Sequence, residues 1–230
     1  LNDTVNVYPL PVALFSHVNA CEGQAVTFHD NSTTGMGVVN YWSWNFGDGT
    51  SSSNQHPSHT YATPGTYNVT LTVGTAGGCL DSIMNQVVVF PQPQVAFAPT
   101  VTSACAGSTV SFTNSSTTTN GAINSWLWNF GNGQTSTAAN PSSNYPTAGT
   151  YTVSLIATTS HGCTDTLRGT VTINSLPNAD AGSNANICRG TSTTLTATGG
   201  SSYQWSPGGS TNASITVSPT SNTMYYVTVT

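Results

Sequence analysis

The feature that most constrains the fold is an internal repeat, in which a segment of the chain returns 84 positions later, as the shift from Trp44 to Trp128 shows. The sequence YWSWNFGDG at 41–49 returns as SWLWNFGNG at 125–133. The same shift places Cys21 on Cys105 and Cys79 on Cys163. Segments that match over such a length must fold alike, so the chain is predicted to consist of tandem domains.

The repeat divides the chain into four parts. A third, more divergent unit opens with ICRG at 187–190, which parallels ACAG at 104–107, and its own last strand is missing. At the other end, VYPLP at 7–11 matches VFPQP at 89–93, where the first full repeat closes. The predicted parts are the closing strand of a preceding domain at 1–9, full domains at 10–91 and 92–176, and an incomplete domain at 177–230.

Two interpretations of the incomplete ends remain open. The favoured one is that the chain is a window taken from a longer array, and the absence of a start methionine and of a leader points the same way. The alternative is strand exchange, in which the orphan strand of one chain completes the open domain of the next. The junctions at 91–93 and 176–177 are short and contain proline, so consecutive domains are expected to be held in line as an extended array.

Within each full repeat the apolar residues alternate with polar ones. Val26 and Phe28 share one face of a strand, Trp42, Trp44 and Phe46 share a face of the next, and 67–73 continues the pattern. A period of two residues is typical of strands that are buried on one face. About seven short strands around a central Trp predict an all-β, immunoglobulin-like sandwich.

The charge composition excludes several classes of partner. Charged residues make up 4% of the chain, Lys is absent, and Arg168 and Arg189 are the only Lys or Arg residues. Nucleic acids and anionic membrane surfaces attract clustered positive charge, so neither is expected as a partner. The apolar runs are far shorter than the roughly 20 residues of a membrane span, so membrane insertion is not expected either.

The motifs of the two full repeats resemble a known family. The segments WNFGDG at 44–49, HPSHTY at 56–61 and PGTYNVTL at 64–71 resemble the polycystic kidney disease (PKD) domain, which implies a PKD-type sandwich over about 10–91 and 92–176. Both repeats have Asn, at 45 and 129, where the family usually has its first Asp. Repeat two also has Asn132 in place of the second Asp and Ser143 at the position of His59, and these departures disfavour a calcium role for the turn.

The third unit carries a separate resemblance. Its segments LTATGG at 195–200 and YQWSP at 203–207 are similar to immunoglobulin-like repeats of large surface proteins of Bacteroidota. Cysteine-bearing PKD arrays resemble the same group of exported proteins, which are associated with adhesion or gliding. The resemblance therefore implies an extracellular protein at the cell surface.

The cysteines are predicted to form disulfides, as befits an exported protein without a Cys-x-x-Cys motif. Cys21 and Cys79 are 58 residues apart, and so are Cys105 and Cys163. The favoured pairing is within each domain. An interdomain bridge from Cys21 to Cys163 remains the alternative, because the two loops of one sandwich tend to lie at opposite ends. Cys188 is left unpaired.

Other candidate sites are each assigned a structural role. Alternation places the Trp residues in the core rather than on a sugar-binding platform. His56 and His59 are three positions apart, a spacing that could bind a metal, but repeat two has Asn140 and Ser143 at these positions. The two histidines are therefore expected to have a structural role in turns. Neither a metal nor a cofactor is predicted. Asp48 is interpreted as the cap of an Asp-Gly turn. No nucleophile motif or evident carboxylate pair is present, so the chain is not expected to be an enzyme.

One modification is predicted. Asp3-Thr4-Val5, Asp81-Ser82-Ile83 and Asp165-Thr166-Leu167 resemble the Asp-Ser/Thr-apolar signal for O-glycosylation in Bacteroidota. Thr4, Ser82 and Thr166 are therefore candidate glycan attachment sites, which would make the protein a glycoprotein.

Taken together, these features predict a non-catalytic structural or adhesive module of an exported surface protein, acting as a stalk or a self-associating filament. Edge strands usually carry charge that prevents sheets from pairing, whereas Ser, Thr and Asn are expected here. The expected partners are other copies or neighbouring repeats of the same protein, with surface glycans or a host or prey cell surface as further candidates. The alternative is a set of spacer or substrate-binding accessory domains of a secreted polysaccharide- or protein-degrading enzyme.

Overall fold

A computed structural model describes residues 7–230, and this part of the chain is all-β, with strands β1 to β23 and no helix, so no helix there could cross a membrane. The predicted fold class is confirmed. The chain divides into two compact units. Of the described residues, one unit comprises 7–102, 110–143 and 151–171, and the other comprises 103–109, 144–150 and 172–230. The first therefore contains the first repeat and most of the second.

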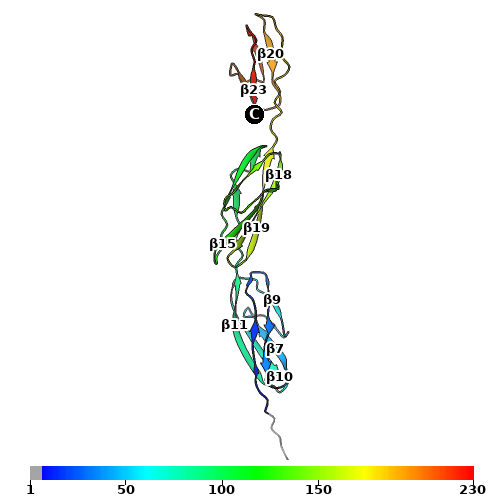
Figure 1. The fold of residues 1–230 in the computed structure, drawn as a ribbon, viewed down its shortest axis with the longest axis vertical. Helices are drawn as coiled ribbons and strands as arrows, with labels where there is room; N and C mark the ends of the chain where they lie inside the picture. The colour runs from blue at the N-terminus through cyan, green and yellow to red at the C-terminus, as the bar shows by residue number, and fades with distance from the viewer. Residues whose placement is uncertain (1–6) are drawn as a thin grey trace, which may run out of the picture. The chain divides into compact units, whose positions relative to one another are not determined.

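The first repeat is a two-layer sandwich. One layer is a five-stranded sheet in the order β3-β11-β10-β7-β8, and the other consists of the two-stranded ladders β1-β6, β2-β5 and β4-β9. Figure 1 shows β7, β10 and β11 side by side in the first of these layers. The strands are β1 (Pro11–Val12), β2 (Phe15–Ser16), β3 (Ala20–Cys21), β4 (Ala25–Thr27), β5 (His29–Asp30), β6 (Thr33–Thr34), β7 (Val39–Asn45), β8 (Ser51–Ser52), β9 (Ser58–Thr60), β10 (Gly65–Thr75) and β11 (Leu80–Phe90).

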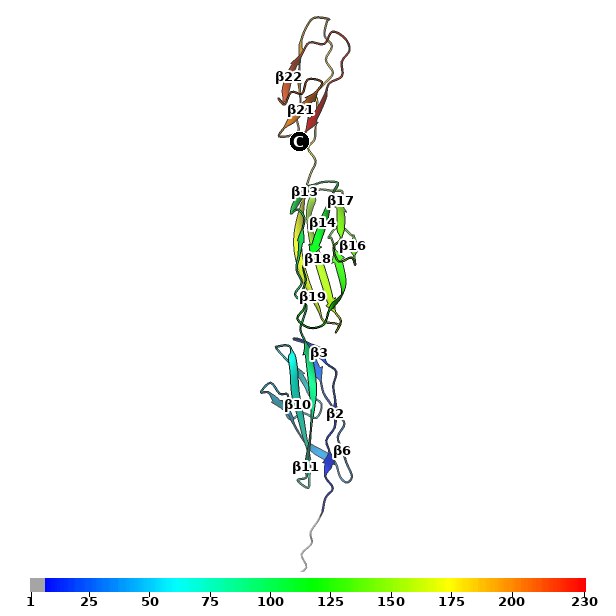
Figure 2. The ribbon, with the colours of Figure 1, turned by 90° about the vertical axis from the view of Figure 1, so that its left-hand side faces the viewer.

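The second repeat has the same plan. Its five-stranded sheet runs β13-β19-β18-β15-β16, and the opposing sheet runs β12-β14-β17. Figure 2 labels strands of both sheets, β14 and β17 of the smaller one and β13, β16, β18 and β19 of the larger one. The strands are β12 (Phe97–Pro99), β13 (Ser103–Cys105), β14 (Ser108–Asn114), β15 (Ile123–Asn129), β16 (Thr135–Ser136), β17 (Ser142–Tyr145), β18 (Gly149–Thr159) and β19 (Thr164–Asn174).

The core of each sandwich lies between its two layers. Phe15 and Phe28 come from the ladder side of repeat one, and Trp44, Leu71 and Val87 come from its five-stranded sheet. Each of these side chains is buried, and the aromatic rings meet edge-on or tilted, with Phe15 and Trp44 5.1 Å apart between ring centroids. The alternation in the sequence therefore predicts the buried face correctly. The edge-to-face geometry adds attraction to the burial of apolar area.

One pairing in each sandwich is parallel. Strand β3 pairs with the end of β11, with Ala20 opposite Val89, and β13 pairs in the same way with β19. This parallel strand brings a cysteine to the end of each domain's last strand. It thereby determines which sulfur atoms can meet.

The third unit consists of two antiparallel ladders, β20 (Thr193–Thr196) with β22 (Ser214–Val217), and β21 (Tyr203–Ser206) with β23 (Tyr226–Val229). Trp205 is buried there, and its indole NH donates to the carbonyl of Asn212 at 3.0 Å. Its missing last strand and the domain boundaries stay predictions. The strand predicted at 1–9 lies largely outside the described residues, and positions 7–10 belong to no strand.

Candidate functional site

The tryptophans at the centres of both sandwiches are core anchors. Trp44 and Trp128 are fully buried, and each indole NH donates to a backbone carbonyl, that of Asn54 or Ala138, at 2.9 Å. These acceptors occupy equivalent positions, so the two repeats satisfy the buried donor in the same way. The structure thus places both rings in the core rather than on an exposed platform.

The Asp-Gly turn of repeat one is closed by its own side chains. Asp48 Oδ1 accepts hydrogen bonds from the Thr50 backbone NH at 3.0 Å and the Thr50 hydroxyl at 2.6 Å, which is the capping role predicted for it. Asp48 Oδ2 lies 2.6 Å from His59 Nε2. The His59 ring in turn stacks on Phe46, with centroids 4.3 Å apart.

The pKa of Asp48 reflects this environment. Partial burial opposes its ionisation, but hydrogen bonds from Thr50 and His59 and the charge of a protonated His59 outweigh that effect, and the pKa of the carboxyl lies below its ordinary value. The hydroxyl of Tyr61 donates to the carbonyl of Phe46 beneath the same turn at 3.0 Å. Burial, followed by the charge of Asp48, raises the pKa of Tyr61.

Repeat two builds the same turn without charge. Asn132 Oδ1 accepts from the Gln134 backbone NH at 3.0 Å, and Asn132 Nδ2 donates to Ser143 Oγ at 3.0 Å. Asn132 and Ser143 thus occupy the positions of Asp48 and His59 and keep a direct contact between them. The sequence shows both substitutions, but only the structure shows that they form one pair.

The second candidate metal ligand, His56, also has a structural task. Its Nδ1 accepts from the backbone NH of Asp30 at 3.1 Å, and Asn140 Oδ1 accepts from the NH of Asn114 at 2.8 Å in repeat two. Residues 7–230 contain no group of three or more His, Cys, Asp or Glu side chains placed to hold a metal ion. His56 and His59 are therefore accounted for by the hydrogen bonds of their turns.

The carboxylate of Asp30 joins several segments of repeat one. It accepts from the indole NH of Trp42 at 2.7 Å, from Gln55 Nε2 at 3.1 Å and from the Ser32 backbone NH at 3.0 Å. Burial opposes its ionisation, but these donors prevail and hold the pKa of Asp30 below its ordinary value. The equivalent residue in repeat two is Asn114.

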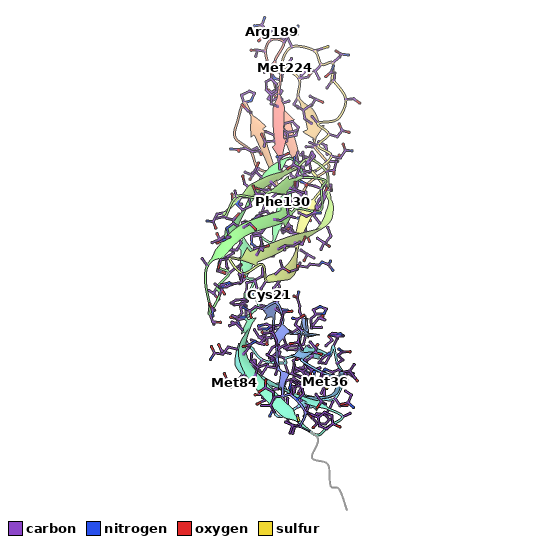
Figure 3. The ribbon with its side chains drawn as sticks, turned by 60° about the horizontal axis from the view of Figure 1, so that its bottom comes forward. Cys21, Met36, Met84, Phe130, Arg189 and Met224 are labelled. Carbon is purple, nitrogen blue, oxygen red and sulfur yellow. A yellow bond between two sulfur atoms is a disulfide. The ribbon has the colours of Figure 1, made fainter. Side chains whose placement is uncertain are left out.

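The disulfide is formed between the two PKD-like repeats. Cys21 and Cys163 are bonded, with their Cα atoms 5.6 Å apart, and Cys79, Cys105 and Cys188 are free. The favoured prediction of Cys21 with Cys79 and Cys105 with Cys163 is therefore wrong in this structure. The interdomain alternative is the one observed. Cys21 is labelled in Figure 3.

Strand geometry explains why the pairing within a domain fails. Cys21 lies beside Phe90 at the end of β11, whereas Cys79 directly precedes the start of the same strand. At about 3.4 Å per residue, the 11 residues of β11 separate these two positions by roughly 35 Å. Cysteines whose Cα atoms are more than about 7 Å apart cannot be bridged. Cys21 and Cys79 therefore cannot be bonded to each other in this fold.

The disulfide is accompanied by other contacts, which together we call the joint: the bridged Cys21 and Cys163, the ring pair Phe90 and His161, and Gln92. The two rings are stacked, with centroids 3.8 Å apart and an interplanar angle of 4°. The Sγ of Cys163 lies 3.9 Å from the carbonyl oxygen of Phe90, and the Gln92 side chain donates to the carbonyl of Glu22 at 3.2 Å. Sequence reasoning missed Phe90 and His161, although Phe90 stands directly before the proline-rich junction.

The bridge closes a large loop. Cys21 and Cys163 are 142 positions apart, for which the chain-entropy model gives about 5 kcal/mol of stabilisation. Because each sandwich also has its own core, this figure is an upper limit on what the bridge adds to folding. The bond joins a cysteine of the first repeat to a cysteine of the second.

The predicted glycan sites are partly described. Ser82 on β11 and Thr166 on β19 are exposed, and Thr4 lies outside the described residues. The neighbouring carboxylates are engaged by backbone donors, since Asp81 accepts from the NH of Ala13 and Asp165 from that of Thr166. Glycosylation at these positions stays a prediction.

Comparison with known families identifies the repeats. A family model described as the PKD domain matches residues 6–89 and again residues 91–173. This chain belongs to the PKD domain family. PKD domains are themselves non-catalytic modules, so the two repeats place the chain among the modular β-sandwich proteins.

Individual relatives match over one PKD domain. The chain is 45% identical to the pre-pro-metalloprotease PrtV of Vibrio cholerae over 78 residues, which is 33% of this chain and 8% of PrtV. It is 44% identical to a microbial collagenase of Vibrio alginolyticus over 75 residues, covering 32% of this chain and 9% of the collagenase. The chain thus spans less than a tenth of the length of these relatives.

Among solved structures, the PKD1 domain of Vibrio anguillarum Epp is 36% identical, with 37% of this chain and 96% of that domain covered and a TM-score of 0.34. The match again corresponds to a single domain. The family assignment itself rests on the two matched ranges.

Proposed function

We propose that this chain is a non-catalytic spacer of an exported surface protein, in which consecutive PKD domains are coupled covalently into a semi-rigid stalk. The observation that supports this best is the Cys21–Cys163 bond, which joins one PKD domain to the next. Disulfides persist in oxidising compartments, which fits an extracellular setting. A spacer needs its domains held apart and aligned, and a bond between them supplies that restraint.

The contacts around the bond support the same proposal. Free rotation at the junction would have to break the Phe90–His161 stack and the Gln92–Glu22 hydrogen bond as well as strain the bridge. Two prolines, Pro91 and Pro93, further restrict the backbone there. Several independent restraints on one short linker are expected to suppress interdomain motion.

We further propose that copies of this chain associate with one another. One edge strand of each five-stranded sheet, β8 in the first repeat and β16 in the second, consists of Ser and Thr alone. They therefore lack the charged side chains that usually prevent edge-to-edge pairing. Lateral contact between stalks would produce the adhesive filament.

Small-angle X-ray scattering of the oxidised chain and of Cys21→Ser and Cys163→Ser tests the coupling. The oxidised chain should give a narrow distribution of interdomain distances, and both variants should give a broader one with unchanged far-UV circular dichroism. Cys188→Ser, which removes a free cysteine, is the matched control and should scatter like the parent. Identical profiles for all four proteins would contradict the spacer proposal.

A second candidate is an accessory domain pair of a secreted degrading enzyme. It is favoured by the relatives, which include a metalloprotease and a collagenase. Co-sedimentation with insoluble collagen separates the two proposals. A spacer should remain in the supernatant, whereas a substrate-binding accessory domain should sediment with the collagen whether or not Cys21 is present.

A further inference from the structure

The joint has two halves that come from different domains. The strand half is a cysteine at the end of the parallel strand β3, beside the last residue of β11. The hairpin half is a cysteine just after the turn between β18 and β19. In the observed joint Cys21 supplies the strand half and Cys163 supplies the hairpin half. Two PKD cysteines remain. Cys79 occupies the hairpin position of the first domain, and Cys105 occupies the strand position of the second.

Cys79 belongs to a hairpin half that is built like the one in use. The turn at Gly78 is closed by hydrogen bonds from Gly78 NH to the Thr75 carbonyl and from Thr75 NH to the Cys79 carbonyl. The turn at Gly162 has the same two bonds, with Thr159 and Cys163 as partners. The two glycines have φ values of +79° and +82°. The hairpin that presents Cys79 therefore has the same backbone as the hairpin that presents Cys163.

The segment around Tyr8 contacts this hairpin in the way that Phe90 contacts the hairpin of Cys163 in the joint. Tyr8 aligns with Phe90, and its carbonyl oxygen lies 3.7 Å from the Sγ of Cys79, against 3.9 Å between Phe90 and Cys163. Its ring lies over Gly77, the counterpart of His161, since a Cβ there would be 2.8 Å from the Tyr8 ring. An aromatic residue thus covers both hairpins. At Cys79 the missing component is the second sulfur.

Cys105 belongs to a strand half that is built like that of Cys21. The NH of Ala106 donates to the carbonyl of Asn174 at 2.9 Å, as the NH of Glu22 donates to that of Phe90 at 2.8 Å. Next to these, Gly107 and Gly23 each donate to the carbonyl of a buried tyrosine. Cys105 is free and exposed, so its sulfur is accessible to a partner.

We propose that Cys79 pairs with the strand-half cysteine of another PKD domain. Cys105 is itself such a strand-half cysteine. PKD domains of this type are thereby linked head to tail by a series of equivalent disulfides. Two thiols lose two protons and two electrons as one S–S bond forms. A small disulfide donor accepts them, and its own S–S bond is cleaved to two thiols. This linkage goes beyond the proposed function, since it would serve a spacer and an accessory pair equally.

Disulfide exchange between copies of the chain tests this pairing. An equal mixture of unlabelled and ¹⁵N-labelled chain is equilibrated in a buffer of reduced and oxidised glutathione. Intermolecular disulfides are then mapped by mass spectrometry of non-reduced peptides. Cys188 is the internal control, because it is free and exposed like Cys105 but does not lie in a PKD domain.

The proposal predicts that the intermolecular disulfide Cys79–Cys105 is about tenfold more abundant than the intermolecular disulfide Cys105–Cys188. One well-packed contact can supply a preference of this size. Cys79→Ser should remove the main species and Cys188→Ser should leave it, with Cys21–Cys163 intact in both as evidence of folding. If exposure alone governed pairing, Cys105–Cys188 would dominate, because Cys79 is only partly exposed. Either that result or no intermolecular bond at Cys79 would overturn the proposal.

Discussion

At the scale of single residues, the two PKD domains reach the same turn with different chemistry. Asp48 and His59 form an ion pair when the imidazole is protonated, and Asn132 and Ser143 form a neutral hydrogen bond in the same place. In each domain the first residue also caps the turn through a backbone NH two positions later. The turn therefore requires a matched pair at these positions rather than one particular charge.

This matching predicts a coupling that a double-mutant cycle can measure. Asp48→Asn and His59→Ser should each destabilise the first domain by about 1 kcal/mol, because each leaves a partly buried partner unmatched. The double variant reproduces the pair of the second domain, and its cost should fall below the sum of the single costs by about 0.5–1 kcal/mol. Urea unfolding followed by peptide-resolved hydrogen exchange gives the values. Strict additivity would show that the two positions act independently.

Residue patterns reveal the core but not the cysteine pairing. Trp44 and Trp128 are predictable because alternation along one strand decides which face is buried. The bond from Cys21 to Cys163 cannot be predicted from such a local pattern, because it depends on which strand ends meet in the folded chain. The equal spacing of 58 residues within each domain favours a pairing that the length of β11 forbids.

At the scale of the strand and turn, two glycines of one turn have different tasks. Gly47 has φ +81°, and a Cβ there would lie 2.6 Å from the carbonyl oxygen of Asn68 on β10. Gly49 has φ +91° with open space around it. Both need a left-handed backbone, but only Gly47 also allows the turn to lie directly on a neighbouring strand. Gly131 and Gly133 repeat this contrast in the second domain.

Alanine at the two positions should separate backbone strain from steric contact. Gly49→Ala should cost about 1 kcal/mol for the conformation alone, and Gly47→Ala should cost at least about 1 kcal/mol more, because β10 must move. For a domain of this size, that difference lowers the melting temperature by about 4–8 °C. Differential scanning calorimetry of the two variants tests the order. Equal melting temperatures would mean that the contact with Asn68 is relieved at no cost.

The long strands are easier to predict than the short ones. The alternation over 67–73 falls within β10, which covers Gly65–Thr75. The parallel pairing of β3 with β11 has no such signature, because two residues are too few for a period. In repeat one the expected strand around Val26 is broken at Phe28, whose NH donates to Pro57 instead of to a ladder partner.

At the scale of the whole molecule, acid should distinguish the two PKD domains. Within residues 7–230, the two carboxyls of lowered pKa, Asp30 and Asp48, both lie in the first domain, and Asn114 and Asn132 replace them in the second. A carboxyl whose pKa is lower when folded stabilises the fold above its unfolded value. That contribution is lost as the pH falls from about 3.8 through the folded pKa.

The first domain should therefore lose hydrogen-exchange protection at a higher pH than the second, below about pH 3.8. Asp30→Asn combined with Asp48→Asn should reduce this difference, because it gives the first domain the residues of the second. Exchange measured from pH 6 to pH 2 at constant ionic strength provides the test. Simultaneous loss of protection in both domains of the parent chain would contradict it.

The position of the disulfide also decides which residues would bear a pulling force. Tension applied to the two ends of the chain passes from Cys21 to Cys163 through the sulfur atoms, so the backbone between them carries no load while the bond is intact. The bypassed segment spans 142 positions, roughly 480 Å when fully stretched. While the disulfide is intact, the molecule cannot extend by this length when it is pulled. After reduction of the disulfide, the segment between the two cysteines would carry the force and could unfold and extend.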